Sequence, residues 1–235
     1  MKKILAAFVG SMALASAPLA LAADATKELK MAYDADPVTL DIHEQLSGGI
    51  LQLSHMTFDP LLRWTKDLGF EPRLAESWER VDDKTMRFKL REGVKFHSGN
   101  ELTTADVKFT FERLKESQDF KAIFKPFSAI NVIDDYTFEL VTSEPYPLLL
   151  NTATYIFPLD SEFYSGQTED GKDKDAILKH GNSFASENLS GTGPYTVTER
   201  KQGVRVEFER FDDYWDTESP GNVGKIVLTM GEGEG

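Results

Sequence analysis

The apolar positions of this chain recur with two different periods, and each period predicts one kind of element. Every second residue is apolar in three stretches, 28–33, 86–90 and 138–140. This alternation is typical of strands with one buried face. The first stretch runs into a turn at 34–37. Two further strands, 195–198 and 204–208, flank a polar turn ending in Gly203 and are therefore predicted to form a hairpin.

Apolar residues spaced three to four apart predict two helices. The stretch 46–62 has this spacing up to Asp59-Pro60, a pair that ends helices. The apolar pattern of 103–117 fits either a strand or a helix. Thr103 and Asp106 have the spacing of a capping box, in which each side chain accepts a free backbone amide, so we predict a helix over 103–117.

Polar stretches between these elements are predicted to be turns and loops. Asp-Asp pairs at 82–83 and 134–135 each precede a strand. Calcium loops also use aspartates, but they need an alternating spacing that neither pair has, so we assign turns. The stretch 165–188 is predicted to be a surface loop with a short helix around 175–179. The mixture of strands and helices indicates an α+β fold.

The first 22 residues have the features of an export signal. Lys2 and Lys3 precede an apolar stretch over 4–17, and Ala20-Leu21-Ala22 is a small-x-small cleavage site. A membrane anchor is the weaker interpretation, because the apolar run is shorter than the ~20 residues that span a bilayer. The chain has no cysteine, which excludes disulfides and a lipid-modified thiol. We therefore expect a periplasmic protein that is secreted by a cleavable signal and is not lipid-anchored.

Composition indicates a folded acidic protein. The 235 residues are 40% hydrophobic and 28% charged, as in soluble globular chains. The formal net charge is −13, and cleavage of the signal would remove two lysines and leave −15. Such a charge opposes binding to nucleic acid or anionic lipid, whereas it favours solubility and, modestly, cationic solutes. No nucleic-acid partner is predicted.

The residue types and spacings that enzymes and metal sites use are missing. There is no G-x-S-x-G motif and no cysteine nucleophile. The four histidines, His43, His55, His97 and His180, have no metal-binding spacing, and a core or boundary position is predicted for His55. Gly191-x-Gly193 lacks the third glycine of a dinucleotide loop and precedes a strand rather than a helix. We therefore predict no catalytic residues, no cofactor and no metal.

Two groups of motifs carry a resemblance to a known family. Gly191-Thr192-Gly193-Pro194-Tyr195 opens the predicted hairpin, and Arg210-Phe211-Asp212-Asp213-Tyr214-Trp215 follows it. Gly191 and Gly193 of the first motif are predicted to adopt backbone angles that are closed to other residues. An upstream block runs through four segments, 74–79, 82–91, 93–99 and 102–107. In order and spacing these motifs resemble the periplasmic solute-binding proteins of ABC importers for dipeptides, oligopeptides and nickel, the family 5 extracellular solute-binding proteins.

The resemblance implies the amino-terminal lobe of a bilobal, type II-like periplasmic-binding-protein fold, with a mixed sheet and flanking helices. Residues 23–50 and 186–235 would form an incomplete ligand-binding lobe, and 51–185 an inserted α+β subdomain of the same lobe. Family members continue through a second lobe, which is absent here. This sequence ends instead in the low-complexity stretch 231–235, which predicts a truncation.

By position in the family, the ligand-binding residues would be Tyr33, Asp34, Gln45, Leu46, Phe124, Asn151 and Tyr155. Aromatic rings suit a peptide cleft because they offer large contact area, although they pack equally well in a core. The implied function is capture of di- or oligopeptides for permease subunits in the inner membrane, by a monomer. Nickel complexes, haem or glycosides are the alternative solutes. A truncated or non-transport envelope interaction domain, without solute binding, is the alternative class.

Overall fold

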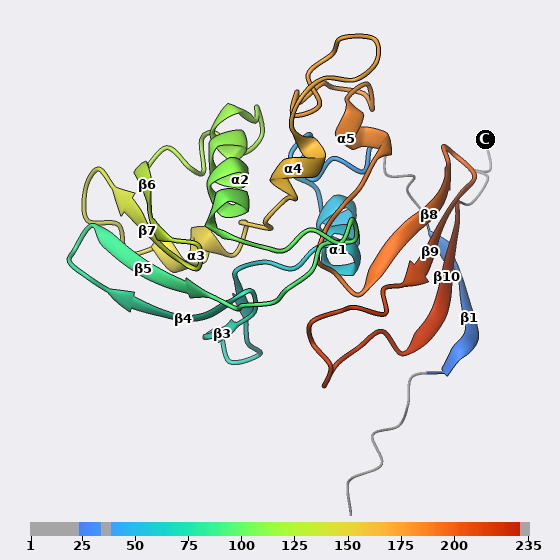
Figure 1. Cartoon of the computed structure of the whole chain (residues 1–235), viewed down its shortest axis with the longest axis horizontal. Coiled ribbons are helices and arrows are strands. Elements are labelled where there is room, and N and C mark those ends of the chain that lie inside the picture. The colour runs from blue at the N-terminus through green and yellow to red at the C-terminus, as the bar shows by residue number, and fades with distance from the viewer. Residues whose placement is uncertain (1–23, 34–38, 231–235) are drawn as a thin grey trace, which may run out of the picture.

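A computed structural model describes residues 24–33 and 39–230, and Figure 1 shows two four-stranded sheets at opposite ends of its long axis. The first sheet has the order β1-β10-β9-β8 and comprises β1 (Asp24–Tyr33), β10 (Val223–Met230), β9 (Arg205–Arg210) and β8 (Tyr195–Lys201). The second has the order β4-β5-β7-β6 and comprises β4 (Ala75–Arg80), β5 (Thr85–Leu90), β7 (Thr137–Thr142) and β6 (Phe127–Asp134). A separate hairpin pairs β2 (Leu62–Trp64) with β3 (Phe70–Pro72).

Five short to medium helices accompany the sheets in the described part of the chain. They are α1 (Gly48–Thr57), α2 (Thr104–Glu116), α3 (Leu149–Ala153), α4 (Ser161–Tyr164) and α5 (Phe184–Glu187). Figure 1 shows α2 beside the second sheet and α1 between the two sheets. Among the residues described, none of these helices has the length and apolar character that crossing a membrane requires.

The first sheet is mixed. Strand β1 runs parallel to β10, whereas β9 pairs antiparallel with both β10 and β8. Alternate residues of β9 and β10, among them Phe208 and Ile226, share a core with Leu53 of α1. The predicted hairpin of 195–198 and 204–208 is confirmed as β8 and β9. Its apolar period matches a sheet with one buried face.

The second sheet buries its apolar face against α2. Phe88 and Phe138 stack face to face at 5.1 Å between their ring centroids, and both join the core that contains Val107 and Phe111 of α2. The capping box is confirmed. Thr103 Oγ1 accepts a backbone amide of the first helical turn, and Asp106 Oδ2 accepts the backbone amide of Thr103. Asp106 also accepts hydrogen bonds from the amide and hydroxyl of Ser161, which ties α4 to α2.

The aspartate pairs make turns, as predicted. Asp82 Oδ1 accepts the amide of Lys84 at 2.8 Å, and Asp134 Oδ1 accepts the amide of Tyr136 at 2.9 Å. These short-range bonds hold the chain at the start of β5 and β7.

The first helix is confirmed over 48–57, and it ends just before Asp59-Pro60, as predicted. Thr57 O also accepts the amide of Gly193 at 3.0 Å, and the chain then turns into β2. One helix prediction needs correction. The short helix around 175–179 is wrong. There Arg113 Nε donates to the carbonyl oxygen of Asp175 at 2.8 Å, and Lys179 Nζ donates to Glu44 O at 2.6 Å. These tertiary contacts outweigh a weak local propensity.

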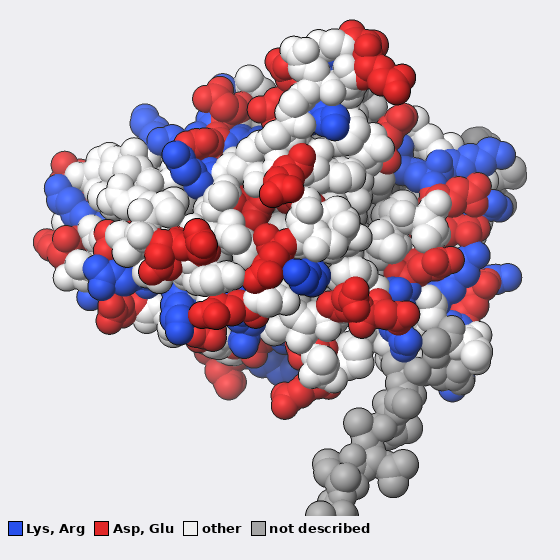
Figure 2. All heavy atoms as spheres, viewed as in Figure 1, with Lys and Arg blue, Asp and Glu red and all other residues white. Residues whose placement is uncertain are grey.

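Charged side chains of both signs are interspersed over the face shown in Figure 2. The excess of acid is therefore spread among basic residues on this face and does not form one large acidic field. Charged residues of the described chain also form ion pairs, as in the contacts of Arg87 with Glu139 and of Lys225 with Glu207. Such partly exposed pairs add little stability.

Candidate functional site

Tyr33 lies at the end of β1, beside the first turn of α1. Its side chain is half-buried, and its hydroxyl donates to Gln52 Oε1 at 3.1 Å. Gly49 O lies 3.5 Å from the same hydroxyl. The ring also packs against the core below the first sheet. The tyrosine therefore connects the end of the sheet to the beginning of α1. Asp34, predicted beside it, lies outside the described residues.

Gln45 and Leu46 form the loop that leads into α1, and a pair of charged residues holds this loop in place. Gln45 is exposed and Leu46 is half-buried. Asp119 Oδ2 accepts the amide of Leu46 at 2.9 Å, and Asp119 Oδ1 accepts from Lys179 Nζ at 3.1 Å. The hydrogen bond from Leu46 and the contact with Lys179 both lower the pKa of Asp119. The carboxylate thus stays charged and fixes the loop.

Asn151 and Tyr155 lie on and just after α3, and both are half-buried. The Tyr155 ring meets Phe120 edge to face, with centroids 6.2 Å apart. Phe120 directly follows Asp119, so the 45–46 loop and the end of α3 both contact the 119–120 segment. Tyr33 contacts α1 instead, through Gln52.

Phe124 does not belong with them, and its assignment as a ligand-binding residue is corrected here. Its side chain is fully buried, with the ring 6.2 Å from that of Phe111 and 5.5 Å from that of Phe127. A solute at the surface has no access to it. An aromatic-rich loop in the sequence is compatible with core packing or with an open cleft, and here the tertiary contacts place the ring in the core.

A buried ion pair that the sequence did not reveal lies below the 45–46 loop. Arg113 of α2 binds both carboxylate oxygens of Asp41, at 2.8 and 2.6 Å. Burial by itself raises the pKa of Asp41, but the hydrogen bonds and charge of Arg113 outweigh it and hold that pKa below its usual value. The Asp41 carboxylate also accepts the amide of His43 at 3.0 Å. The pair fixes the start of the loop.

His43 lies within this buried region and has no hydrogen-bond partner on either ring nitrogen in the described part of the chain. Its ring meets Phe120 edge to face at 6.0 Å. Burial, reinforced by the nearby charge of Arg113, lowers the pKa of His43 to about 3, although Asp41 acts in the opposite direction. The imidazole is therefore neutral at physiological pH and acts as a packing residue.

The second signature motif is built around the carboxylate of Asp59. Tyr214 donates to Oδ1 at 2.9 Å, Trp215 Nε1 to Oδ2 at 2.8 Å and Thr192 to Oδ2 at 3.1 Å. Arg73 completes the set with a contact of 3.1 Å. Burial and the charge of Asp59 raise the pKa of Tyr214 far above its usual value, so the phenol stays a donor. These signature residues are therefore structural.

The signature glycines serve close packing, which corrects their expected role. Neither Gly191 nor Gly193 has a positive φ. A Cβ atom on Gly191 would lie 2.0 Å from Thr57 O, and one on Gly193 would lie 2.4 Å from the carbonyl carbon of Thr57. His97 holds this turn from the other side. Its Nε2 lies 2.9 Å from Gly193 O, and its Nδ1 accepts the amide of Gly191 at 3.3 Å.

We expect Trp215→Ala to lower the free energy of unfolding by about 3 kcal/mol. The change removes the bond to Asp59 and a ring that lies 4.7 Å from the guanidinium carbons of both Arg73 and Arg91. Urea denaturation measures the loss. The matched control is Trp64→Ala, whose ring is 44% exposed on the β2–β3 hairpin and should cost about 1 kcal/mol. Equal losses would show that the Asp59 cluster does not hold the fold.

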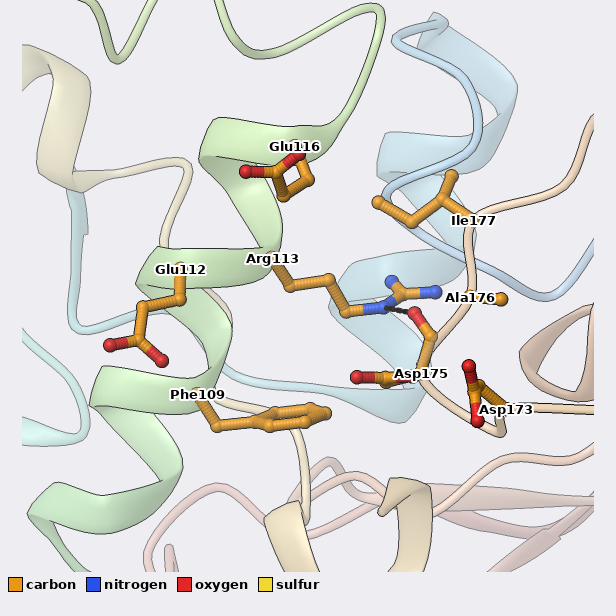
Figure 3. Close-up of a pocket in the computed structure, with 8 residues that line it drawn as sticks. All are labelled: Phe109, Glu112, Arg113, Glu116, Asp173, Asp175, Ala176 and Ile177. Carbon is orange, nitrogen blue, oxygen red and sulfur yellow. Dashed lines mark hydrogen bonds between the residues drawn. The ribbon is translucent and has the colours of Figure 1, made fainter. Parts of the chain in front are cut away.

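An acidic groove of about 480 Å³ separates α2 from the 173–177 segment. Figure 3 shows Phe109, Glu112, Arg113 and Glu116 on the helix side, facing Asp173, Asp175, Ala176 and Ile177. Arg113 crosses the groove to the carbonyl of Asp175 and is already bound to Asp41. The groove is therefore bridged by a structural contact, and it shares no residue with the predicted ligand-binding set.

The histidines outside this region do not form a metal centre. His55 is exposed and stacks edge to face on Phe157 at 5.1 Å, so it lies at the boundary of the core. Among the residues that the structure describes, no three His, Cys, Asp or Glu side chains come together where they could hold a metal ion. The half-buried candidate residues that the structure describes offer hydroxyl, amide and apolar groups.

Comparison with known proteins gives concordant matches. Residues 69–234 match the family described as "Bacterial extracellular solute-binding proteins, family 5 Middle". The dipeptide-binding protein of Escherichia coli (strain K12) is 31% identical over 169 residues, which cover 62% of this chain and 30% of that protein. Heme-binding protein A of Haemophilus influenzae is 27% identical over 200 residues, which cover 75% of this chain and 35% of that protein.

A solved structure gives the same fold. The oligopeptide-binding protein AppA from Bacillus subtilis, in complex with a nonapeptide, aligns with a TM-score of 0.75 at 22% identity, covering 88% of this chain and 40% of that one. The chain thus spans about a third of the length of the curated relatives named above. The predicted fold, one lobe with a mixed sheet and flanking helices, is confirmed.

Proposed function

The chain belongs to the bacterial extracellular solute-binding proteins of family 5, and from this membership we propose that it forms one lobe of a periplasmic receptor for peptides. The receptor would deliver di- or oligopeptides to the permease subunits of an ABC importer in the inner membrane. Residues 1–22 would direct export and then be removed. The match over 69–234 is the observation that carries this proposal.

We place the solute against Tyr33, Gln45, Leu46, Asn151 and Tyr155. Phenol, amide and leucine side chains suit the polar backbone and varied side chains of a peptide. Nickel or haem iron would favour histidine, cysteine or carboxylate ligands, and no such group of three is present in the described ranges. We further propose that 23–50 with 186–235 form the body of the lobe, and that 51–185 is an inserted subdomain.

Peptide binding by this chain alone should be weak. A ligand in a cleft is usually enclosed by 70–90%, and one lobe covers about half of that surface. If the missing contacts supplied about 4 kcal/mol, a micromolar site would become millimolar. Nuclear magnetic resonance of the isotope-labelled chain, titrated with a di- and tripeptide pool, detects binding in this range. We expect amide shifts at Tyr33, in 45–46 and in 151–155.

The control variants separate the site from the rest of the surface. Gln45→Ala should at least halve the shift changes of its neighbours, because it removes an amide that contacts the solute in our proposal. The variant should keep the fold, because Gln45 is exposed. Gln118→Ala, which is also exposed, should leave them unchanged. Shifts confined to the acidic groove, or produced only by haem or a nickel–histidine complex, would replace the peptide proposal. Absence of shifts with every solute would favour a non-transport envelope domain.

A further inference from the structure

The loop that leads into α1 has little stiffness of its own. It runs from Gln45 through Leu46 and Ser47 to two consecutive glycines, which are also the first two residues of the helix. Glycine has more backbone freedom to lose than any other residue, and a helix that starts with glycines is weakened at that end. The conformation of this loop must therefore be imposed by contacts from other parts of the chain.

Two charged side chains from distant segments hold the residues on either side of Gln45. Lys179 Nζ donates to Glu44 O at 2.6 Å, and Asp119 Oδ2 accepts the amide of Leu46 at 2.9 Å. Lys179 Nζ also donates to Asp119 Oδ1 at 3.1 Å, so the contacts form one connected group, which we call the 119–179 clamp. Gln45, which is exposed, lies between two backbone groups that this clamp fixes.

The chain reverses directly after Lys179, and the reversal adds a second contact to Glu44. His180 and Gly181 both have a positive φ, of 64° and 73°. Such an angle is uncommon for a residue other than glycine, and it is kept only where the surrounding contacts require it. Here the turn brings the amide of Gly181 to 3.2 Å from Glu44 Oε1, to which it donates. The Lys179 segment is thus anchored on Glu44 through a side chain and through the backbone.

We propose that Lys179 is a positioning residue for solute binding, which holds Gln45 and Leu46 in the conformation that receives the solute and does not contact the solute itself. This inference rests on the proposed function, which places the solute against these two residues. A loop that is ordered before binding has less conformational entropy to lose on binding. Lys179 thereby raises the fraction of chains that are competent to bind.

The 119–179 clamp acts on the loop rather than on the whole fold. The side chains of Lys179 and Asp119 are 46% and 31% exposed. Ion pairs with this degree of exposure contribute little to global stability. Loss of the clamp should therefore release the loop locally and leave the rest of the fold in place.

Lys179→Met tests the proposal in the isotope-labelled whole chain, because it removes the ammonium group and keeps an unbranched side chain. We expect the apparent Kd of the di- and tripeptide pool, from nuclear magnetic resonance titration, to rise about fivefold, as it would if the binding-competent fraction fell to about a fifth. Without peptide, the amide of Leu46 should exchange its hydrogen with solvent about tenfold faster. Lys179→Arg keeps a positive charge with donors and should restore both values.

The controls keep the result specific to the clamp. Lys172→Met makes the same change in the same 165–183 stretch, at a lysine that pairs with Asp170 and is 66% exposed, and it should leave both values unchanged. Circular dichroism checks the fold of every variant. Asp119→Asn removes the carboxylate charge that Lys179 contacts, and it gives a second test in the same direction if Lys179→Met unfolds.

The possible failures can be told apart. If a folded Lys179→Met chain keeps its Kd or its rate of exchange at Leu46, this inference is overturned and the proposed function is not. The same holds if Lys179→Arg restores neither value. If the unchanged chain binds no peptide, the proposed function fails and this inference fails with it.

Discussion

Replacing Arg113 by leucine is expected to lower the free energy of unfolding by about 3–5 kcal/mol. Asp41 and Arg113 expose 0% and 4% of their side chains, and two short hydrogen bonds join them. Without Arg113 the Asp41 carboxylate is left charged in a buried place, or must take up a proton. The cost of that uncompensated charge is much larger than the net stabilisation from the intact pair.

Denaturation by urea at neutral pH measures this loss, and two further variants test its cause. Arg87→Leu removes an arginine whose side chain is 41% exposed, and it should cost less than about 1 kcal/mol. The double variant Asp41→Leu/Arg113→Leu removes both charges and should recover part of the lost stability. If the double variant is less stable than Arg113→Leu alone, the uncompensated charge of Asp41 is not the cause of the loss.

Acid is expected to destabilise the protein through His43. The pKa of His43 is about 3 in the folded chain, against 6.5 for an unperturbed histidine, because the ring is buried beside Arg113. Below pH 6.5 the unfolded chain therefore binds a proton that the folded chain rejects. Stability falls by about 1.4 kcal/mol for each pH unit, or about 3 kcal/mol between pH 6.5 and pH 4.

A second, half-buried histidine acts with the same sign. Burial lowers the pKa of His97 to about 4, although its contact with Gly193 acts in the opposite direction. The lowered pKa of Asp41 also stabilises the folded chain, but this contribution is lost only as the pH falls below its usual value of 3.8. Burial also lowers the pKa of His55, which adds to the loss, and raises the pKa of Asp106, which opposes it. The window from pH 6.5 to pH 4 therefore reports on these groups together with His43 and His97, and a His43 variant is needed to isolate its share.

Urea denaturation at several pH values from 7 to 4 tests this directly. His43→Leu should keep the neutral-pH stability and flatten the loss on acidification by about half. His180→Asn is the control, because His180 is exposed and asparagine tolerates its positive φ of 64°. A His43→Leu chain that loses stability with acid as steeply as the unchanged chain contradicts the assignment of His43 as the sensitive group.

Position in the family predicts Gln45, Leu46 and Tyr155 as ligand-binding residues, and the structure leaves each side chain at least partly accessible, so the prediction stands to be tested. The same reasoning predicts Phe124, which is buried. A local sequence specifies an aromatic ring but does not specify what covers it. That depends on residues that the fold brings in from elsewhere, such as Phe111.

The supporting contacts were missed for a related reason. Asp119 contacts Leu46 across a separation of 73 residues in the sequence, and Lys179 contacts Glu44 across a separation of 135 residues. Asp41 and Arg113 are 72 residues apart. No spacing rule in one sequence connects such residues. A charged residue in a polar stretch carries no local sign that its partner is distant and that both will be buried.

The sequence by itself determined the elements whose cause is local. A two-residue period specified β5, β7 and the β8–β9 hairpin, and the Thr103 capping box specified the start of α2, because these patterns act within a few residues. Tertiary structure alone decided the absence of a helix near 175–179 and the reason for the glycines at 191 and 193. Each depends on segments far apart in the chain, where close packing and long-range hydrogen bonds outweigh local preference.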